Sequence, residues 1–374
     1  MKVPFPTIAQ RITRTGGHAS GFDYMRVCLS LSIVTLHSAI TSYGLAADQA
    51  IFESPARPIV RMILPAFFAL SGFLVAGSLE RSKTLFMFLG LRVLRIYPAL
   101  AVEVLLSAFI LGPLLTTLPL HTYFSDPQYF LYLRNVLGDV HFYLPGMFEH
   151  NPLPNIVNGQ LWTIPFELGC YITLAGIALL GVKRHRILGP IFVVLVTFTY
   201  LLVTLYRHHG VIVPVPGAIN GALLIATFLS GVSIYMYRDV LPFTPTSGLI
   251  SGVLSVALLG FVPSGDFLAP VPAAYFTVYL GLMNPSRRFL FGGDYSYGIF
   301  LYGFAIQQTI VYAVPYGDFW PVNILLSIPT VILFAAVSWH FVEKPAQRLR
   351  SVLKIGEGKI LSWRQPAPDL QSAE

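Results

Sequence analysis

The stretch FDYMRVCLSLSIVTLHSAITSYG, residues 22–44, is apolar and long enough to cross a bilayer, yet it carries Arg26 and His37. Ionisable groups inside a membrane span are costly and tend to face a cavity or a partner, so they indicate a functional site. The two residues are 11 positions apart, and at about 100° per residue they project from nearly the same helical face. Their separation along the helix axis is roughly 16 Å, about half the thickness of the hydrocarbon layer.

The composition of the whole chain is typical of a polytopic membrane protein. Of the 374 residues, 55% are hydrophobic and only 11% are charged, whereas soluble domains contain about 25% charged residues. The net charge of +7 does not indicate a nucleic-acid partner, because basic residues in a membrane protein set its orientation. Cys28 and Cys170 both lie in apolar stretches and are expected to be free, and no Cys/His spacing indicates a metal site.

Apolar segments then follow one another along the chain, and we predict an all-α integral membrane protein with about ten transmembrane helices. Their approximate limits are 22–44, 58–79, 95–116, 160–181, 188–206, 218–237, 247–263, 268–283, 296–314 and 321–342. We expect this transmembrane domain to cover residues 22–348, between tails at 1–21 and 349–374.

The distribution of lysine and arginine predicts the orientation. With the N-terminus inside, all but four of the 24 Lys and Arg residues fall on the inner side, the exceptions being Arg57, Arg61, Arg134 and Arg207. The positive-inside rule therefore favours ten spans in the cytoplasmic (inner) membrane with both termini cytoplasmic. The N-terminal tail is expected to be flexible. The C-terminal tail begins basic and amphipathic, which suits an anionic inner leaflet, and is expected to end disordered.

The longest predicted outer loop covers residues 117–159. Its middle, YFLYLRNVLGDVHFYL (129–144), is apolar but too charged to span. It is either re-entrant or interfacial, or it is a plain extracytoplasmic loop.

His37 and Glu167 are the candidate catalytic residues. A neutral imidazole can accept a proton from a hydroxyl near pH 7, which suits a general base; the alternative is a histidine that is hydrogen-bonded for structure. Glu167 is expected roughly 10 Å deep in the fourth segment and His37 roughly 9 Å deep in the first, so their depths are similar. A carboxylate beside an imidazole can orient it and stabilise the imidazolium, and contact between the two is a hypothesis.

Arg92 and Arg95, in RVLR, share one helical face at the inner start of the third segment. With Arg26 they form a candidate anchor for a phosphorylated donor from the cytoplasm; the alternative is that they only mark the inner boundary. Ser71 lies among the small residues of FFALSGFLV (67–75), which either permit close helix packing or border an open passage.

These motifs, in this order, resemble the acyltransferase-3 family of membrane O-acyltransferases. The resemblance covers residues 20–348 and rests on FDYMR followed by His37, FFALSGFLV (67–75), FLGLRVLRIYPAL (88–100), NGQLWTIPFELGCYI (158–172), DYSYGIFLYGF (294–304) and FVEKP (341–345). It implies a ten-helix core that transfers an acyl group, usually acetyl, from cytoplasmic acyl-coenzyme A to a hydroxyl of a carbohydrate or glycolipid acceptor. The functional positions that it implies are Arg26, His37, Arg92, Arg95 and Glu167.

Two features distinguish this chain within the family that it resembles. Family members often carry a histidine in the span that matches DYSYGIFLYGF, whereas this chain has Gly303, Phe304 and Ala305 there. A chain of this length also resembles the single-domain branch, which modifies exopolysaccharide, O-antigen or nodulation factors. Two alternatives to an enzyme stay open: a transporter or flippase for a glycan or acyl intermediate, which would not bind coenzyme A, and a non-catalytic scaffold, which would tolerate loss of His37.

Overall fold

The computed structural model describes residues 5–17, 19–208, 219–287 and 293–363, and these residues form helices joined by loops, without a β-strand. Each of the ten predicted apolar segments overlaps a helix, but the third of these helices begins at Leu85 rather than at the predicted residue 95. These helices are α2 (Ser20–Tyr43), α4 (Arg57–Arg81), α5 (Leu85–Leu106), α9 (Ile164–Leu179), α10 (Leu188–Arg207), α11 (Gly221–Met236), α12 (Pro245–Phe261), α13 (Pro270–Gly281), α14 (Ser296–Ala313) and α15 (Trp320–Ser338).

Shorter elements connect them. They are α1 (Ile8–Arg14), α3 (Leu45–Glu53), the π-helix η1 (Ser107–Leu111), α6 (Gly112–Leu115), α7 (Leu120–Ser125), α8 (Pro127–Leu133), the 3-10 helices η2 (Arg134–Leu137), η3 (Gly159–Thr163) and η4 (Gly265–Phe267), the π-helix η6 (Trp339–Glu343), α16 (Lys344–Arg348) and α17 (Arg350–Trp363).

Six helical stretches in the described part of the chain are long and apolar enough to cross a membrane. They are Ser20–Tyr43, Arg57–Arg81, Leu85–Leu115, Gly159–Leu179, Leu188–Arg207 and Trp320–Ser362. Large apolar side chains on their outer faces are exposed, among them Val194 and Phe198 of α10 and Leu325 and Leu333 of α15. An apolar surface of this kind suits lipid rather than water, so the structure supports the predicted all-α membrane protein.

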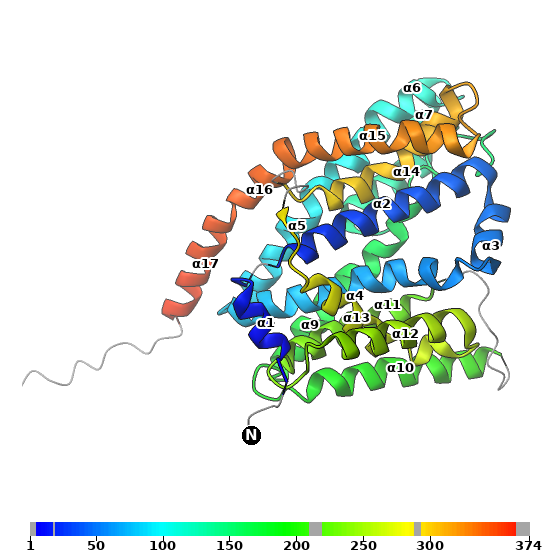
Figure 1. Ribbon diagram of the computed structural model, residues 1–374. Coiled ribbons are helices and arrows are strands. Elements are labelled where there is room, and N and C mark those ends of the chain that lie inside the picture. Colours follow the sequence, from blue (N-terminus) through cyan, green and yellow to red (C-terminus); the bar gives the residue numbers. More distant parts are fainter. Residues whose placement is uncertain (1–4, 18, 209–218, 288–292, 364–374) are drawn as a thin grey trace, which may run out of the picture.

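The helices pack in two groups (Figure 1). Helices α2, α14 and α15 contact one another, and α4, α11, α12 and α13 form the second group, with α10 against α11. At the centre of the second group, the backbones of α4 and α11 are in direct contact at Gly72. A Cβ at this position would lie only 2.0 Å from the Phe228 carbonyl oxygen of α11. The glycine in FFALSGFLV thus serves close helix packing.

The N-terminal segment differs from the flexible tail expected from its sequence. Thr7 caps α1, and Ile8 is buried and donates its backbone N–H to the Leu241 carbonyl at 3.0 Å. The Arg11 Nε donates to the Leu282 carbonyl, also at 3.0 Å. These contacts hold α1 against the segments that follow α11 and α13. A short helix is stabilised mainly by such tertiary packing of its apolar face.

The 117–159 loop is built into the bundle. Tyr123 and Tyr132 are fully buried in its helical part, and the Asn135 side-chain amide donates to the carbonyls of Tyr132 (2.7 Å) and His141 (2.8 Å). Arg134 also pairs with the Asp139 carboxylate at 2.6 Å, so two of the charges that prevent this stretch from spanning are paired within the loop itself.

At the other end of the chain, the basic amphipathic segment forms α16 and α17 (Figure 1). Its predicted disordered end, residues 364–374, lies outside the described residues.

Candidate functional site

Two cavities meet inside the bundle. The first, here the His37 cavity, has a volume of about 380 Å³ and is walled by α2, α3, α4, η3 and α14. The second, here the arginine cavity, has a volume of about 430 Å³ and is walled by the same α2, α4 and α14 together with α5, α9, α11 and the α16–α17 segment. Leu64, Thr163 and Phe300 line both, so the two cavities share a boundary.

The arginine cavity brings together five of the six predicted site residues: Ser71, Arg26, Arg92, Arg95 and Glu167. Its charges are organised around Asp294, just before α14. The Asp294 carboxylate pairs with Arg26 at 3.0 Å and with Arg95 at 2.9 Å, and Arg95 also lies 3.8 Å from Glu343. Burial by itself would raise the pKa of Asp294, but the charges of Arg95 and Arg26 lower it to about 2, so this carboxylate is ionised.

Arg92 differs from its two neighbours. Its Nη2 donates to the Ser78 hydroxyl at 3.1 Å, and its guanidinium lies over the rings of Phe88 and Tyr171. The Nε is buried without a hydrogen-bond partner, and none of the described carboxylates forms an ion pair with Arg92. This arginine thus presents the least compensated positive charge inside the cavity, as an anion site requires.

Glu167 lies in the first turn of α9 and faces the arginine cavity. Its carboxylate accepts a hydrogen bond from the Tyr171 hydroxyl at 2.5 Å, and that hydroxyl is 3.5 Å from Ser71 Oγ. A line of polar groups therefore runs along this wall from Glu167 to Ser71.

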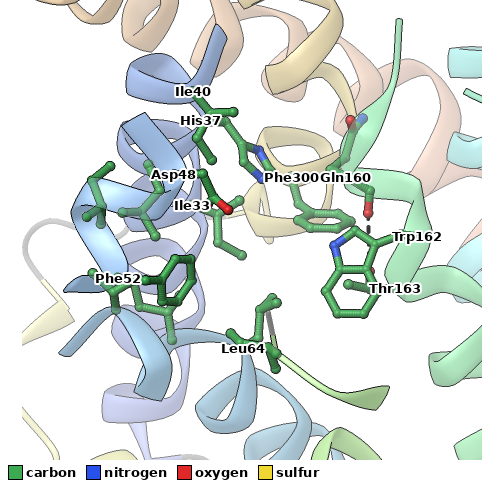
Figure 2. A pocket seen from close by; sticks show the side chains of 15 residues that line it. Ile33, His37, Ile40, Asp48, Phe52, Leu64, Gln160, Trp162, Thr163 and Phe300 are labelled. Carbon is green, nitrogen blue, oxygen red and sulfur yellow. Dashed lines mark hydrogen bonds between the residues drawn. The ribbon is translucent and has the colours of Figure 1, made fainter. Parts of the chain in front are cut away.

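His37 stands in the other cavity. Its imidazole meets the edge of Phe304 with ring centroids 5.1 Å apart. The segment that departs from the family pattern thus borders the predicted base. Asp48 of α3 and Gln160 and Trp162 of η3 line the same cavity (Figure 2).

The predicted contact between His37 and Glu167 is absent: among the described residues no hydrogen bond or ion pair joins them, and they line different cavities. Counting residues along two helices estimates depth but not the rotation of each helix about its axis. The 3-10 helix η3 precedes α9 and directs Gln160 to the His37 cavity, while Glu167 turns to the arginine cavity.

Sequence reasoning missed two carboxylates. Asp294 opens DYSYGIFLYGF, and an acidic residue directly before an apolar segment was its only signal. Asp48 lies just beyond the predicted end of the first span, and burial raises its pKa above the usual value. Gln160 lies within NGQLWTIPFELGCYI (158–172), and no chemical role was predicted for it.

Comparison with known proteins agrees with the motifs. A family model described as an acyltransferase domain matches residues 20–341. The O-acetyl transferase of Shigella phage Sf6 is 28% identical over 340 residues, which cover 86% of this chain and 94% of that protein. Nodulation protein 10 of Rhizobium leguminosarum bv. viciae is 26% identical over 362 residues, covering 91% of this chain and 96% of that protein. No solved structure matches the chain.

Proposed function

Since the chain belongs to the acyltransferase-3 family, we propose that it transfers an acetyl group from acetyl-coenzyme A to a hydroxyl of a carbohydrate acceptor at the cytoplasmic membrane. The observation that carries this proposal is the pair of adjoining cavities, one rich in arginine and one holding an imidazole. A donor that carries several phosphates needs a basic binding site, and an uncharged acceptor needs a different one. The two sites must adjoin so that the substrates can react. The name of the phage relative, O-acetyl transferase, supports acetyl as the group and oxygen as its acceptor atom.

The proposed topology has ten spans and both termini in the cytoplasm. The arginine cavity, with Arg26 in the first third of α2 and Arg92 and Arg95 in the first half of α5, then opens toward the cytoplasm. The His37 cavity lies toward the opposite side. Donor and acceptor approach each other from the two faces, and neither has to cross the membrane.

The donor is proposed to lie in the arginine cavity, where guanidinium groups bind its phosphates. Its narrow pantetheine arm passes Ser71 and Tyr171, and the thioester reaches the boundary at Leu64, Thr163 and Phe300. Glu167 holds Tyr171 along this path, and it acts on the reaction through that wall rather than through a hydrogen bond to His37.

The acceptor hydroxyl is proposed to bind next to His37. The imidazole removes the hydroxyl proton as the oxygen attacks the thioester carbonyl carbon. The carbon–sulfur bond then breaks, and the coenzyme A thiolate takes the proton back from the imidazolium. The ester and free coenzyme A are the products, and the carboxylate of Asp48, in the same cavity, stabilises the transient imidazolium.

The experiment compares ester-linked acyl groups on surface and exported glycans by mass spectrometry. Cells carry the wild-type protein, His37→Ala or His150→Ala, the last being an exposed histidine of the 117–159 loop. We expect esters with wild type and His150→Ala and none with His37→Ala at equal membrane abundance. Unchanged esters with His37→Ala would overturn the assigned base. Failure of the purified wild-type protein to bind coenzyme A would overturn the donor and favour a transporter.

A further inference from the structure

We propose that α17 closes the cytoplasmic mouth of the arginine cavity and that Arg350 at its start binds the 3′-phosphate of coenzyme A. This inference rests on the proposed function, because it assigns a second phosphate site to the same donor. It concerns a helix that follows the last predicted span, in a segment that the sequence suggests is a tail.

The first observation is that α17 is fastened to the bundle. The Glu357 carboxylate accepts hydrogen bonds from the backbone N–H groups of Lys83 (3.0 Å) and Thr84 (2.9 Å) and from the Thr84 hydroxyl (3.1 Å). These groups stand at the start of α5, where backbone donors have no partner within the helix. Leu353 packs where a Cβ at Gly90 would lie, 2.7 Å from its Cδ2. Helix α17 is therefore held along α5.

The second observation is the path of the chain between α15 and α17. The π-helix η6 ends α15, and the following α16 and α17 run off at an angle from it (Figure 1). Gln347 of α16 and Arg350 of α17 both line the arginine cavity. A π-helix inserts an extra residue into the turn and so redirects the chain that follows. The segment after the last span thus forms part of the cavity wall.

The third observation is the charge balance of the cavity, whose lining includes Arg26, Arg92, Arg95 and Arg350. Asp294 pairs with the first and the third of these arginines. Arg92 is half-buried, whereas Arg350 is exposed and forms no hydrogen bond or ion pair with the residues that the structure describes. Two guanidinium groups therefore remain for a ligand, one inside the cavity and one at its mouth.

Coenzyme A carries its anionic groups at two places: a pyrophosphate at the head of the pantetheine arm and a 3′-phosphate on the ribose. The thiol is at the far end of the arm and must reach the boundary with the His37 cavity, so the nucleotide lies at the mouth. This direction assigns the pyrophosphate to the side of Arg92 and the 3′-phosphate to Arg350. A guanidinium matches a terminal phosphate monoester particularly well, because both can form two parallel hydrogen bonds.

The test measures dissociation constants of the purified protein in lipid nanodiscs for coenzyme A and for 3′-dephospho-coenzyme A, by calorimetry. We expect Arg350→Ala to weaken coenzyme A binding by about 10-fold and to leave the dephospho ligand unchanged. Arg350→Lys should restore part of the difference. The matched control is Lys354→Ala, which removes an exposed charge of α17 that does not line the cavity.

Glu357→Ala tests the fastening of α17 separately. It should reproduce the selective loss for coenzyme A, because Arg350 is then no longer held at the mouth. Equal losses for both ligands in Arg350→Ala, or none for coenzyme A, would overturn the inference.

The wild-type protein separates this inference from the proposed function. If it binds coenzyme A and the dephospho ligand equally well, only the 3′-phosphate site is refuted. If it binds neither, the donor assignment itself is wrong.

Discussion

The arginine cavity and the His37 cavity share a boundary but are built in different ways. In the first, Asp294 lies within 4 Å of Arg26 and Arg95, while Arg92 and Arg350 have no carboxylate partner among the described residues. In the second, one imidazole stands among apolar walls, with Asp48 and Gln160 as its polar companions. The contrast supports the proposed division of roles, in which the first cavity binds the phosphates of the donor and the second holds the general base.

The strongest test of this division is His37→Ala. Loss of a general base should lower the transfer rate by about 100-fold or more, while the dissociation constant of coenzyme A stays the same. Ester formation and calorimetric binding on one preparation check the two effects. A large loss of coenzyme A affinity would show that the cavities do not act separately.

Arg92→Ala should have the largest effect within the arginine cavity. Arg92 has no carboxylate partner among the described residues, so its charge is free for a ligand, and its loss should weaken coenzyme A binding by about 10- to 100-fold. Arg26→Ala should weaken it less, because that arginine is already paired with Asp294. Arg81→Ala, an exposed arginine at the end of α4 that does not line the cavity, is the control. Equal effects for Arg92 and Arg26 would contradict the charge balance described above.

Asp294→Asn should strengthen phosphate binding and weaken the stability of the fold. Freeing Arg26 and Arg95 should tighten phosphate binding by about threefold, while loss of the ion pairs should lower the free energy of unfolding by about 1–3 kcal/mol. Because the pKa of Asp294 is lowered from 3.8 to about 2, its contribution to stability is fully present above pH 4 and is lost as the pH falls toward 2. Thermal unfolding of wild type and variant at several pH values between 7 and 2 checks this. A difference between wild type and variant that shrank already between pH 7 and pH 5 would refute it.

The smallest effect is expected from Asp48→Asn in the His37 cavity. Turnover should fall by about threefold without a change in coenzyme A affinity. Since burial raises the pKa of Asp48, the wild-type carboxyl becomes neutral as the pH falls, and the two pH–rate profiles should converge at low pH. Glu53→Gln, at an exposed position of the same helix, should behave as wild type. Profiles that stay parallel would remove Asp48 from the proton transfer.

Apolar segments long enough to cross a bilayer predicted the helices. The charged residues within these segments predicted most of the arginine cavity. A charge in an apolar span is costly, so Arg26, Arg92, Arg95 and Glu167 stand out from their surroundings, and the structure places them together. Asp48 and Gln160 do not stand out, because one follows a span and the other is uncharged. The rotation of each helix about its axis depends on tertiary packing, which is why the predicted contact between His37 and Glu167 failed.

The crossing of α4 and α11 has a mechanical consequence for the reaction. Besides Gly72, Gly231 has no room for a Cβ, which would lie 2.2 Å from the Ala69 carbonyl oxygen. Helix α4 lines both cavities, and this interlock prevents it from sliding past α11. Helix α4 is therefore a fixed wall of both cavities, so a movement that changes the shape of either cavity has to involve other elements of its wall, such as α3 in the His37 cavity.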